Sequence, residues 1–175
     1  SLPIQGKKVE YFLISRRSSY KGGTRYSARG IDDDGNVANF VETEQMVYYG
    51  GYCCAFVQIR GSIPIFFQQR GMTAATKINR TFDLTNGAYT KHFEELIKTY
   101  GYILCINLMS KGKTEEQMLT EAFEIHIKNN NNPHVRYEFF DFHFHTKGNR
   151  FDKVNSLIYK ISPLVERFKF YAQDV

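Results

Sequence analysis

Two runs of β-strand character, separated by a pair of glycines, constrain the fold of this chain most. Residues 36–48 and 52–60 carry many β-branched and aromatic side chains, and Gly50 and Gly51 lie between them. Glycine accommodates the positive φ angles of a tight hairpin turn, so this pattern predicts two antiparallel strands. Further strands are predicted at residues 11–15 and 24–29, with a second tight turn at residues 32–35. The first third of the chain therefore predicts an antiparallel meander.

After residue 86 the pattern changes to alternating helices and strands. Phe93, Leu96 and Tyr100 recur at helical spacing on one face, and Thr114 with Gln117 resembles a capping box. Helices are predicted near residues 89–100, 114–128 and 151–170, and strands at residues 102–109 and 135–142. Strands that are connected through helices imply parallel pairing. We therefore expect an α/β fold with α+β character at the N-terminal end, in which helices flank a mixed, partly parallel sheet.

The composition is typical of a single globular domain. The chain has 175 residues, of which 42% are hydrophobic and 23% are charged, and this length suffices for one sizeable core. Three cysteines without a framework spacing favour reduced thiols and a cytosolic environment. No run of residues has the apolar length of a transmembrane helix, so we expect any membrane anchor to lie outside this chain.

The basic charge of the chain favours an anionic partner. The formal net charge is +5 and the isoelectric point is near 9.0. Nucleic acid, acidic lipid and phosphorylated small molecules all satisfy this charge. The chain has no zinc-finger spacing, RNP-like motif or basic helix, and its cations gather mainly in one N-terminal loop, so nucleic acid is not expected. Anionic lipid headgroups fit this arrangement at least as well.

The densest polar segment of the chain predicts a binding site for an anion. Guanidinium groups supply charge-assisted donors, and a carboxylate close to a bound phosphate needs an arginine beside it. Glu42 is therefore expected to orient Arg25, Arg29 or Arg60. These residues could instead have structural roles. The arginines could lie on a solvated loop, Asn36 could stabilise a turn, and Arg60 could belong to a simple turn. The candidate binding or supporting residues in this segment are Arg25, Arg29, Asn36, Asn39, Glu42, Arg60 and Ser62.

Asp141 and His143 form a second candidate group. They are two residues apart, so on an extended strand they would share a face, with His145 continuing the line. We expect Phe140 and Phe142 to pack inward while Asp141 and His143 reach the site or fix a loop around it. A His-x-His pair can bind metal, but no further Cys, His or Asp lies at a supporting spacing. Neither a metal nor another cofactor is predicted.

Several of these segments together resemble the Sac family of phosphoinositide phosphatases. The resemblance is carried by residues 24–45 (TRYSARGIDDDGNVANFVETEQ) and continues through 56–65 (FVQIRGSIPI), 91–93 (KHF), 106–108 (INL) and 137–143 (YEFFDFH). It covers nearly the whole chain in family order. It implies action on phosphoinositide headgroups in a membrane surface, at the cytoplasmic face of endomembranes such as the ER, Golgi or endosomes.

Enzymes of this family use a Cys-x-x-x-x-x-Arg loop, in which a thiolate attacks phosphorus. In this chain Cys53 is followed six positions later by Ile59 and Cys105 by Lys111, and only Cys54 has an arginine, Arg60, at that spacing. Residues 55–59 are apolar and lack the glycines of a phosphate cradle.

The catalytic cysteine is therefore expected beyond Val175, and no catalytic residue is predicted within the chain. The resemblance implies that residues 1–175 are part of one Sac catalytic domain, without its N-terminal subdomain or its cysteine loop. The alternative is a non-catalytic phosphoinositide-binding or scaffolding Sac-like protein.

Overall fold

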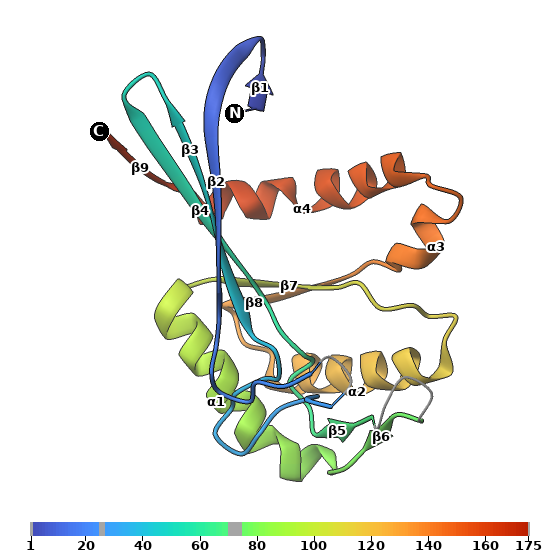
Figure 1. Ribbon diagram of the computed structural model, residues 1–175. Helices are drawn as coiled ribbons and strands as arrows, with labels where there is room; N and C mark the ends of the chain where they lie inside the picture. Colours follow the sequence, from blue (N-terminus) through green and yellow to red (C-terminus); the bar gives the residue numbers. More distant parts are fainter. Residues whose placement is uncertain (1, 25–26, 70–74, 175) are drawn as a thin grey trace.

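The main sheet of the protein is antiparallel and is built largely from the first third of the chain. The computed structural model describes residues 2–24, 27–69 and 75–174 (Figure 1). Five strands pair in the order β1-β2-β3-β4-β9. Their bounds are Leu2–Ile4 (β1), Lys7–Arg17 (β2), Val41–Tyr49 (β3), Tyr52–Arg60 (β4) and Tyr171–Asp174 (β9). Figure 1 shows β2, β3 and β4 as long strands that extend well above the helices.

The hairpin of β3 and β4 confirms the prediction made from the paired glycines. Tyr49 pairs with Tyr52, and the intervening Gly50 and Gly51 have φ angles of 58° and 84°. The predicted start of the strand at residue 36 was wrong. Asn39 adopts a left-handed conformation with φ of 55°, which interrupts the extended backbone, so β3 begins at Val41.

The strand predicted at residues 24–29 was also wrong where the structure describes it. The backbone N–H groups of Ser27 and Ala28 both donate to the carbonyl of Thr24, at 3.1 Å, so these three residues do not belong to a strand. β2 is longer than predicted and extends from Lys7 to Arg17. In the meander, residues 18–40 connect the long strands β2 and β3, and the glycine hairpin connects β3 and β4.

The second half of the chain alternates helices and strands, which confirms the α/β class. Strands β7 (Ile103–Asn107) and β8 (Val135–Phe139) pair in parallel through the connecting helix α2 (Thr114–Asn130). Within the described residues this parallel pair forms a separate sheet from the antiparallel one, and β5 (Phe67–Gln68) pairs with β6 (Lys77–Ile78). In Figure 1 the β7–β8 pair lies between α4 (Val154–Phe168) and the layer of α1 (Phe82–Tyr100) and α2.

Two local predictions in this half were wrong. The capping box does not form: Lys113 is the N-cap of α2, without a side-chain cap, and Thr114 is already helical. β8 ends at Phe139 rather than at residue 142, because Asp141 accepts a hydrogen bond from the N–H of Phe144 and starts the short helix α3 (Phe142–Thr146). A 3₁₀ turn, η1 (Phe151–Lys153), then leads into α4.

The principal hydrophobic core lies between α1, α2 and the parallel strands. The predicted face of α1 is confirmed, since Phe93 and Leu96 are buried there and Ile97 and Tyr100 pack against them. Each fully buried large apolar side chain stabilises the fold by roughly 1.5–3 kcal/mol. None of the helices in the described part of the chain has the length and apolarity needed to cross a membrane. The buried members of this core are Tyr89, Phe93, Leu96, Ile103, Phe123 and Val135.

Candidate functional site

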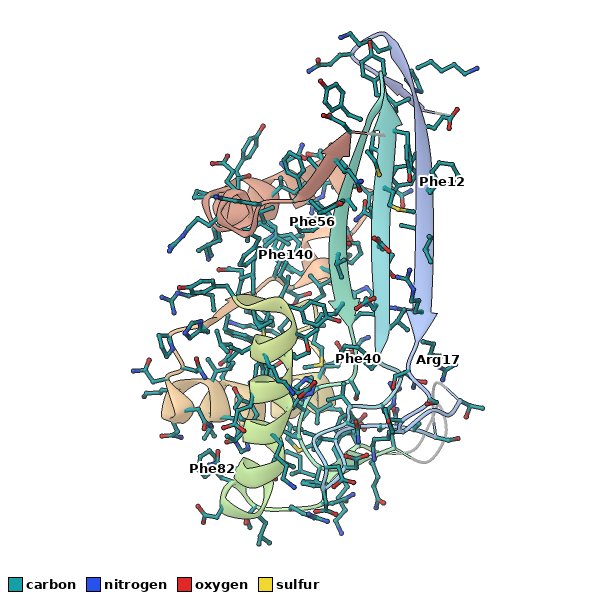
Figure 2. All side chains as sticks on the ribbon, turned by 90° about the vertical axis from the view of Figure 1, so that its left-hand side faces the viewer. Phe12, Arg17, Phe40, Phe56, Phe82 and Phe140 are labelled. Carbon is teal, nitrogen blue, oxygen red and sulfur yellow. The ribbon has the colours of Figure 1, made fainter. Side chains whose placement is uncertain are left out.

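The loop between β2 and β3 is anchored by Arg17, the last residue of β2. Its guanidinium donates to the carbonyl of Gly23 at 2.5 Å and to Oδ1 of Asn39. The amide nitrogen of Asn39 in turn donates to the carbonyl of Ala28 at 3.3 Å. Both functional ends of the Asn39 side chain therefore hold the loop together. Figure 2 shows Arg17 and Phe40 at the lower ends of the long strands, where this loop begins and ends.

A glycine contact fixes the middle of the same loop against the segment after β4. The N–H of Gly30 donates to Oγ of Ser62 at 2.9 Å, and the N–H of Ile31 donates to the carbonyl of Ile65 at 3.0 Å. Gly30 has φ of 67°, and a Cβ atom there would lie 2.4 Å from the carbonyl oxygen of Ile65. Only glycine fits at this position. The Ser62 hydroxyl accepts a hydrogen bond from the loop backbone and keeps its own proton to donate.

Asp32 and Asn36 stabilise the turn at residues 32–35. Oδ1 of Asp32 accepts from the N–H of Asn36 at 2.8 Å and from the N–H of Asp34 at 3.1 Å. The Asn36 side-chain amide donates back to the Asp32 carboxylate at 3.2 and 3.3 Å. These contacts correspond to the turn-stabilising alternative for Asn36.

This turn contacts α1 and Arg80, which lies just before the helix. Asp33 forms an ion pair with Arg80, and its carbonyl accepts from Nζ of Lys91 at 2.9 Å. Nδ1 of His92 lies 2.9 Å from the carbonyl of Gly35. Burial lowers the pKa of His92 to about 4, although the contact with Gly35 acts in the opposite direction. The imidazole is therefore neutral at pH 7, and its Nδ1–H donates to Gly35.

Glu42 connects the main sheet to the end of α1. The phenol of Tyr100 donates to Oε2 of Glu42 at 2.5 Å, and Arg16 lies 3.5 Å from Oε1. Arg16 also pairs with Glu44 at 3.1 Å. Burial raises the pKa of Tyr100 to about 12, and its bond to the Glu42 carboxylate adds to the shift. Arg60 is paired with Val41, next to Glu42, so it lies on the opposite face of the sheet and the expected pairing of Glu42 with Arg60 does not form.

The predicted arginines have different surroundings. Arg29 is half-buried, and its guanidinium donates to Oε1 of Gln69 at 2.9 Å. Arg60 is the exposed last residue of β4, and its side chain forms no hydrogen bond or ion pair with any residue in the described ranges. Arg25 lies outside the described residues. Of the two predicted arginines that the structure describes, Arg29 is engaged with Gln69, whereas the donors of Arg60 are available to a ligand.

Asp141 fastens the loop after β7 to the start of α3. Its carboxylate accepts from the N–H of Lys111 at 2.8 Å, from Oγ of Ser110 at 3.2 Å and from the N–H of Phe144 at 2.9 Å. Burial raises the pKa of Asp141, but these bonds and the nearby charge of His143 outweigh burial, so the pKa lies below the ordinary value.

The predicted strand face shared by Asp141 and His143 was wrong, because the chain turns into α3 between them. His143 is exposed, whereas the ring of His145 stacks on Phe140 with 4.5 Å between centroids. Asp141 therefore holds a loop at the carboxyl ends of the parallel strands, while His143 faces solvent.

All three cysteines lie on β-strands, Cys53 and Cys54 on β4 and Cys105 on β7. Cys54 and Arg60 both lie on the extended strand β4, which separates them by about 20 Å. Burial raises the pKa of the Cys105 thiol to about 12, and Cys53 is buried within the sheet. In the described part of the chain no three His, Cys, Asp or Glu side chains are grouped as metal ligands.

The structure brings three of the seven predicted residues of the first group into one framework. Asn36, Asn39 and Ser62 all hold the loop at residues 18–40, whereas no described contact joins that loop to Asp141 or His143. The roles of Arg80 and Tyr100 were not predicted. Each contacts a residue about fifty positions away in the sequence, and the only available signal was the place of Tyr100 on the inward face of α1.

Comparison with known proteins identifies the family of this chain. The SacI homology domain matches residues 1–147. The chain is 38% identical over 169 residues to synaptojanin-1 of Homo sapiens and 39% identical over 169 residues to inositol-1,4,5-trisphosphate 5-phosphatase 1 of Schizosaccharomyces pombe. It is 38% identical over 178 residues to the polyphosphatidylinositol phosphatase INP53 of Saccharomyces cerevisiae.

These alignments cover 94%, 95% and 98% of this chain, but only 10%, 16% and 16% of the respective relatives. The chain belongs to the SacI homology domain family, which confirms the resemblance found in the sequence. It spans between a tenth and a sixth of the length of these relatives.

Proposed function

We propose that the protein containing this chain is a polyphosphoinositide phosphatase, which hydrolyses phosphate monoesters on the inositol ring of membrane lipids. Family membership carries this proposal, because relatives named as phosphatases of polyphosphatidylinositol or inositol phosphate match 95–98% of the chain at 38–39% identity. The net charge of +5 suits an anionic substrate at a membrane surface. The expected setting is the cytoplasmic face of endomembranes.

The proposed reaction uses a cysteine outside residues 1–175. Its thiolate attacks phosphorus, the bond from phosphorus to the inositol oxygen breaks, and a cysteinyl phosphate forms. Water then hydrolyses this intermediate to release inorganic phosphate and restore the thiol. The arginine of the cysteine loop stabilises the charge on the transferring phosphoryl group. The unsuitable positions of Cys53, Cys54 and Cys105 support this placement of the nucleophile.

Within this scheme residues 1–175 supply part of one catalytic domain. We assign Arg29, Arg60 and Arg25 to attraction of the phosphorylated headgroup. Removal of one such donor from a site that stabilises developing charge typically lowers turnover by roughly ten- to a thousandfold. The remaining candidates hold the loops around the site in place: Asn36, Asn39, Glu42, Ser62, Asp141 and His143.

Phosphate release from vesicles that contain each phosphatidylinositol phosphate tests the proposal. The full-length protein should release phosphate, while residues 1–175 alone should release none above the buffer background. Cys54→Ser in the full-length protein should leave turnover unchanged. Turnover by residues 1–175 that disappears in Cys54→Ser would overturn the placement of the nucleophile. A folded full-length protein that binds these lipids without releasing phosphate would instead establish the non-catalytic alternative.

A further inference from the structure

The charged side chains of the three long strands are sorted between the two faces of the sheet. Alternate residues of a strand point to opposite faces, and the register of β2, β3 and β4 is continuous. Arg17, Val41 and Arg60 lie side by side and share one face, which we call the Arg60 face. The opposite face carries Arg16 and all the carboxylates of β2 and β3, namely Glu10, Glu42 and Glu44.

An open depression of about 350 Å³ lies on the Arg60 face. Two residues of β2, two of β3 and three of β4 line it. Six of the seven alternate along their strands and belong to the Arg60 face, whereas Ile59, which pairs with Glu42, belongs to the opposite face. Figure 2 shows the three contributing strands side by side. The lining residues are Tyr11 and Leu13 of β2, Thr43 and Gln45 of β3, and Gln58, Ile59 and Arg60 of β4.

The depression offers hydrogen-bond donors without a nearby negative charge. The phenol of Tyr11 donates to Oε1 of Gln45 at 3.0 Å, which orients the amide and leaves its nitrogen without a partner among the described residues. Thr43 shares a 2.9 Å hydrogen bond with Ser15. The side chains of Gln58 and Arg60 are exposed and bind nothing in the described ranges. These donors therefore remain available to a ligand.

The nearest carboxylates lie on the other face of the sheet, because alternate side chains of a strand point to opposite faces. Glu42 and Glu44 are separated from the depression by the sheet itself, where Arg16 and Tyr100 hold them. Asp174 is on the Arg60 face, but it pairs with Tyr52 at the far end of β4, about 26 Å from Arg60. The local field of the depression is consequently positive, although Glu42 adjoins it in the sequence.

We propose that the depression on the Arg60 face binds a phosphorylated polyol. The Arg60 guanidinium takes a phosphate group by two parallel hydrogen bonds, and the amides of Gln45 and Gln58 with the Thr43 hydroxyl bind ring hydroxyls. Leu13 and the ring of Tyr11 contact the apolar C–H face of the polyol. The phosphorylated polyol class follows from these side chains, whereas the choice of an inositol ring rests on the proposed function.

Nuclear magnetic resonance with soluble inositol 1,4,5-trisphosphate tests the site directly. At physiological ionic strength the side-chain amide signals of Gln45 and Gln58 should shift in a saturable manner. Neither myo-inositol nor inorganic phosphate at equal concentration should reproduce the shifts, because each provides only half of the contacts. Shifts that are equally large with inorganic phosphate, or shifts spread over both faces of the sheet, would overturn the proposal.

A pair of charge-matched variants separates a site from general attraction. Arg60→Gln should weaken binding of inositol 1,4,5-trisphosphate by about tenfold or more, the effect of losing one charge-assisted contact. Arg16→Gln removes the same charge from the opposite face and should change the affinity less than about twofold by the same contact rule. Gln58→Leu, which suits a strand, should weaken binding without altering net charge. Equal losses of affinity in Arg60→Gln and Arg16→Gln would show that no specific site exists. Unchanged affinity in both Arg60→Gln and Gln58→Leu would show the same.

Vesicles containing phosphatidylinositol 4-phosphate decide whether the headgroup arrives on a lipid or free in solution. Competition by soluble inositol 1,4,5-trisphosphate for vesicle binding, lost in Arg60→Gln, supports a lipid headgroup as the occupant. Binding of the soluble compound with no vesicle binding supports a free phosphorylated polyol. Phosphate release by the full-length protein without any signal from Gln45 or Gln58 would refute this site and leave the proposed function standing. Binding at the site by a full-length protein that releases no phosphate would support this site and refute the proposed function.

Discussion

Tyr100 and Glu42 join the last turn of α1 to the start of β3 through a 2.5 Å hydrogen bond from phenol to carboxylate. Tyr100→Phe should lower the free energy of unfolding by about 1–3 kcal/mol, because the carboxylate loses this donor and remains partly buried. Urea denaturation at pH 7 measures the change. Tyr102→Phe is the matched control, since Tyr102 is exposed and its hydroxyl forms no hydrogen bond with the described residues, while the ring that stacks on His134 is retained.

The same bond gives a pH dependence of known sign. The pKa of Tyr100 is raised to about 12 in the folded protein, so folding favours the protonated phenol. Its contribution is complete below the ordinary tyrosine pKa near 10 and is lost as the pH rises toward 12. Wild type and Tyr100→Phe should therefore converge in stability above about pH 10, by the same linkage. Identical urea midpoints at pH 7 would contradict the importance of this bond.

Gly30→Ala should destabilise the protein far more than Gly50→Ala. Both glycines have positive φ, 67° and 58°, so alanine is strained at each by roughly 1–2 kcal/mol. At Gly30 the new methyl group would also lie 2.4 Å from a backbone carbonyl oxygen, whereas at Gly50 nothing lies within 4 Å. We expect a total loss of about 3 kcal/mol or more for Gly30→Ala. Equal shifts of the thermal midpoint in the two variants would refute the close approach at Gly30.

Asp141→Asn should loosen the loop after β7. The substitution keeps the size of the side chain but weakens an acceptor that now binds Ser110, Lys111 and Phe144. We expect a loss of about 1–3 kcal/mol in the free energy of unfolding. Hydrogen exchange of the Lys111 and Phe144 amides should accelerate selectively. Asp152→Asn, a surface substitution at a pair 3.6 Å from Lys153, is the control and should leave both rates unchanged.

His92→Asn should flatten the dependence of stability on acid pH. The pKa of His92 is lowered to about 4, so the unfolded chain binds this proton more tightly than the folded protein does. The stabilisation is complete above the ordinary histidine pKa of 6.5 and is lost as the pH falls toward 4, by at most about 3 kcal/mol. Asparagine retains an N–H donor toward Gly35 but does not titrate.

The measurement is the urea midpoint of wild type and His92→Asn between pH 7 and pH 4.5. His126, whose pKa is also lowered by burial, is present in both proteins and cancels in the difference. Parallel slopes for wild type and His92→Asn would show that His92 is not buried as a neutral group.

Predictions from the sequence succeeded where the pattern was local. The paired glycines at residues 50–51 determine the β3–β4 hairpin through their own φ angles, and the spacing of Phe93, Leu96 and Tyr100 determines the inward face of α1. Predictions failed where one side chain altered the backbone. Asn39 in a left-handed conformation shortened β3, and Asp141 as an N-cap ended β8 and began α3.

The candidate site was predictable as a set of residues but not as a set of contacts. Glu42 was expected beside an arginine, and it does pair with one, Arg16, but its shortest bond comes from Tyr100, 58 positions away. Such contacts depend on how α1 packs against the sheet, which local periodicity does not specify. The depression on the Arg60 face likewise required the register of three strands, because each strand contributes only two or three of its lining residues.

The segment from Gly35 to Glu42 is attached to α1 at both of its ends. His92 binds Gly35 and Tyr100 binds Glu42, and these two side chains are eight residues apart on the helix, or about 12 Å along its axis. The helix therefore fixes the distance between the two ends of this segment, which includes Asn36 and Asn39. A change in that span requires the loss of one of the two attachments. The position of α1 is consequently coupled to this segment, which β2 also holds through Arg17 and Asn39.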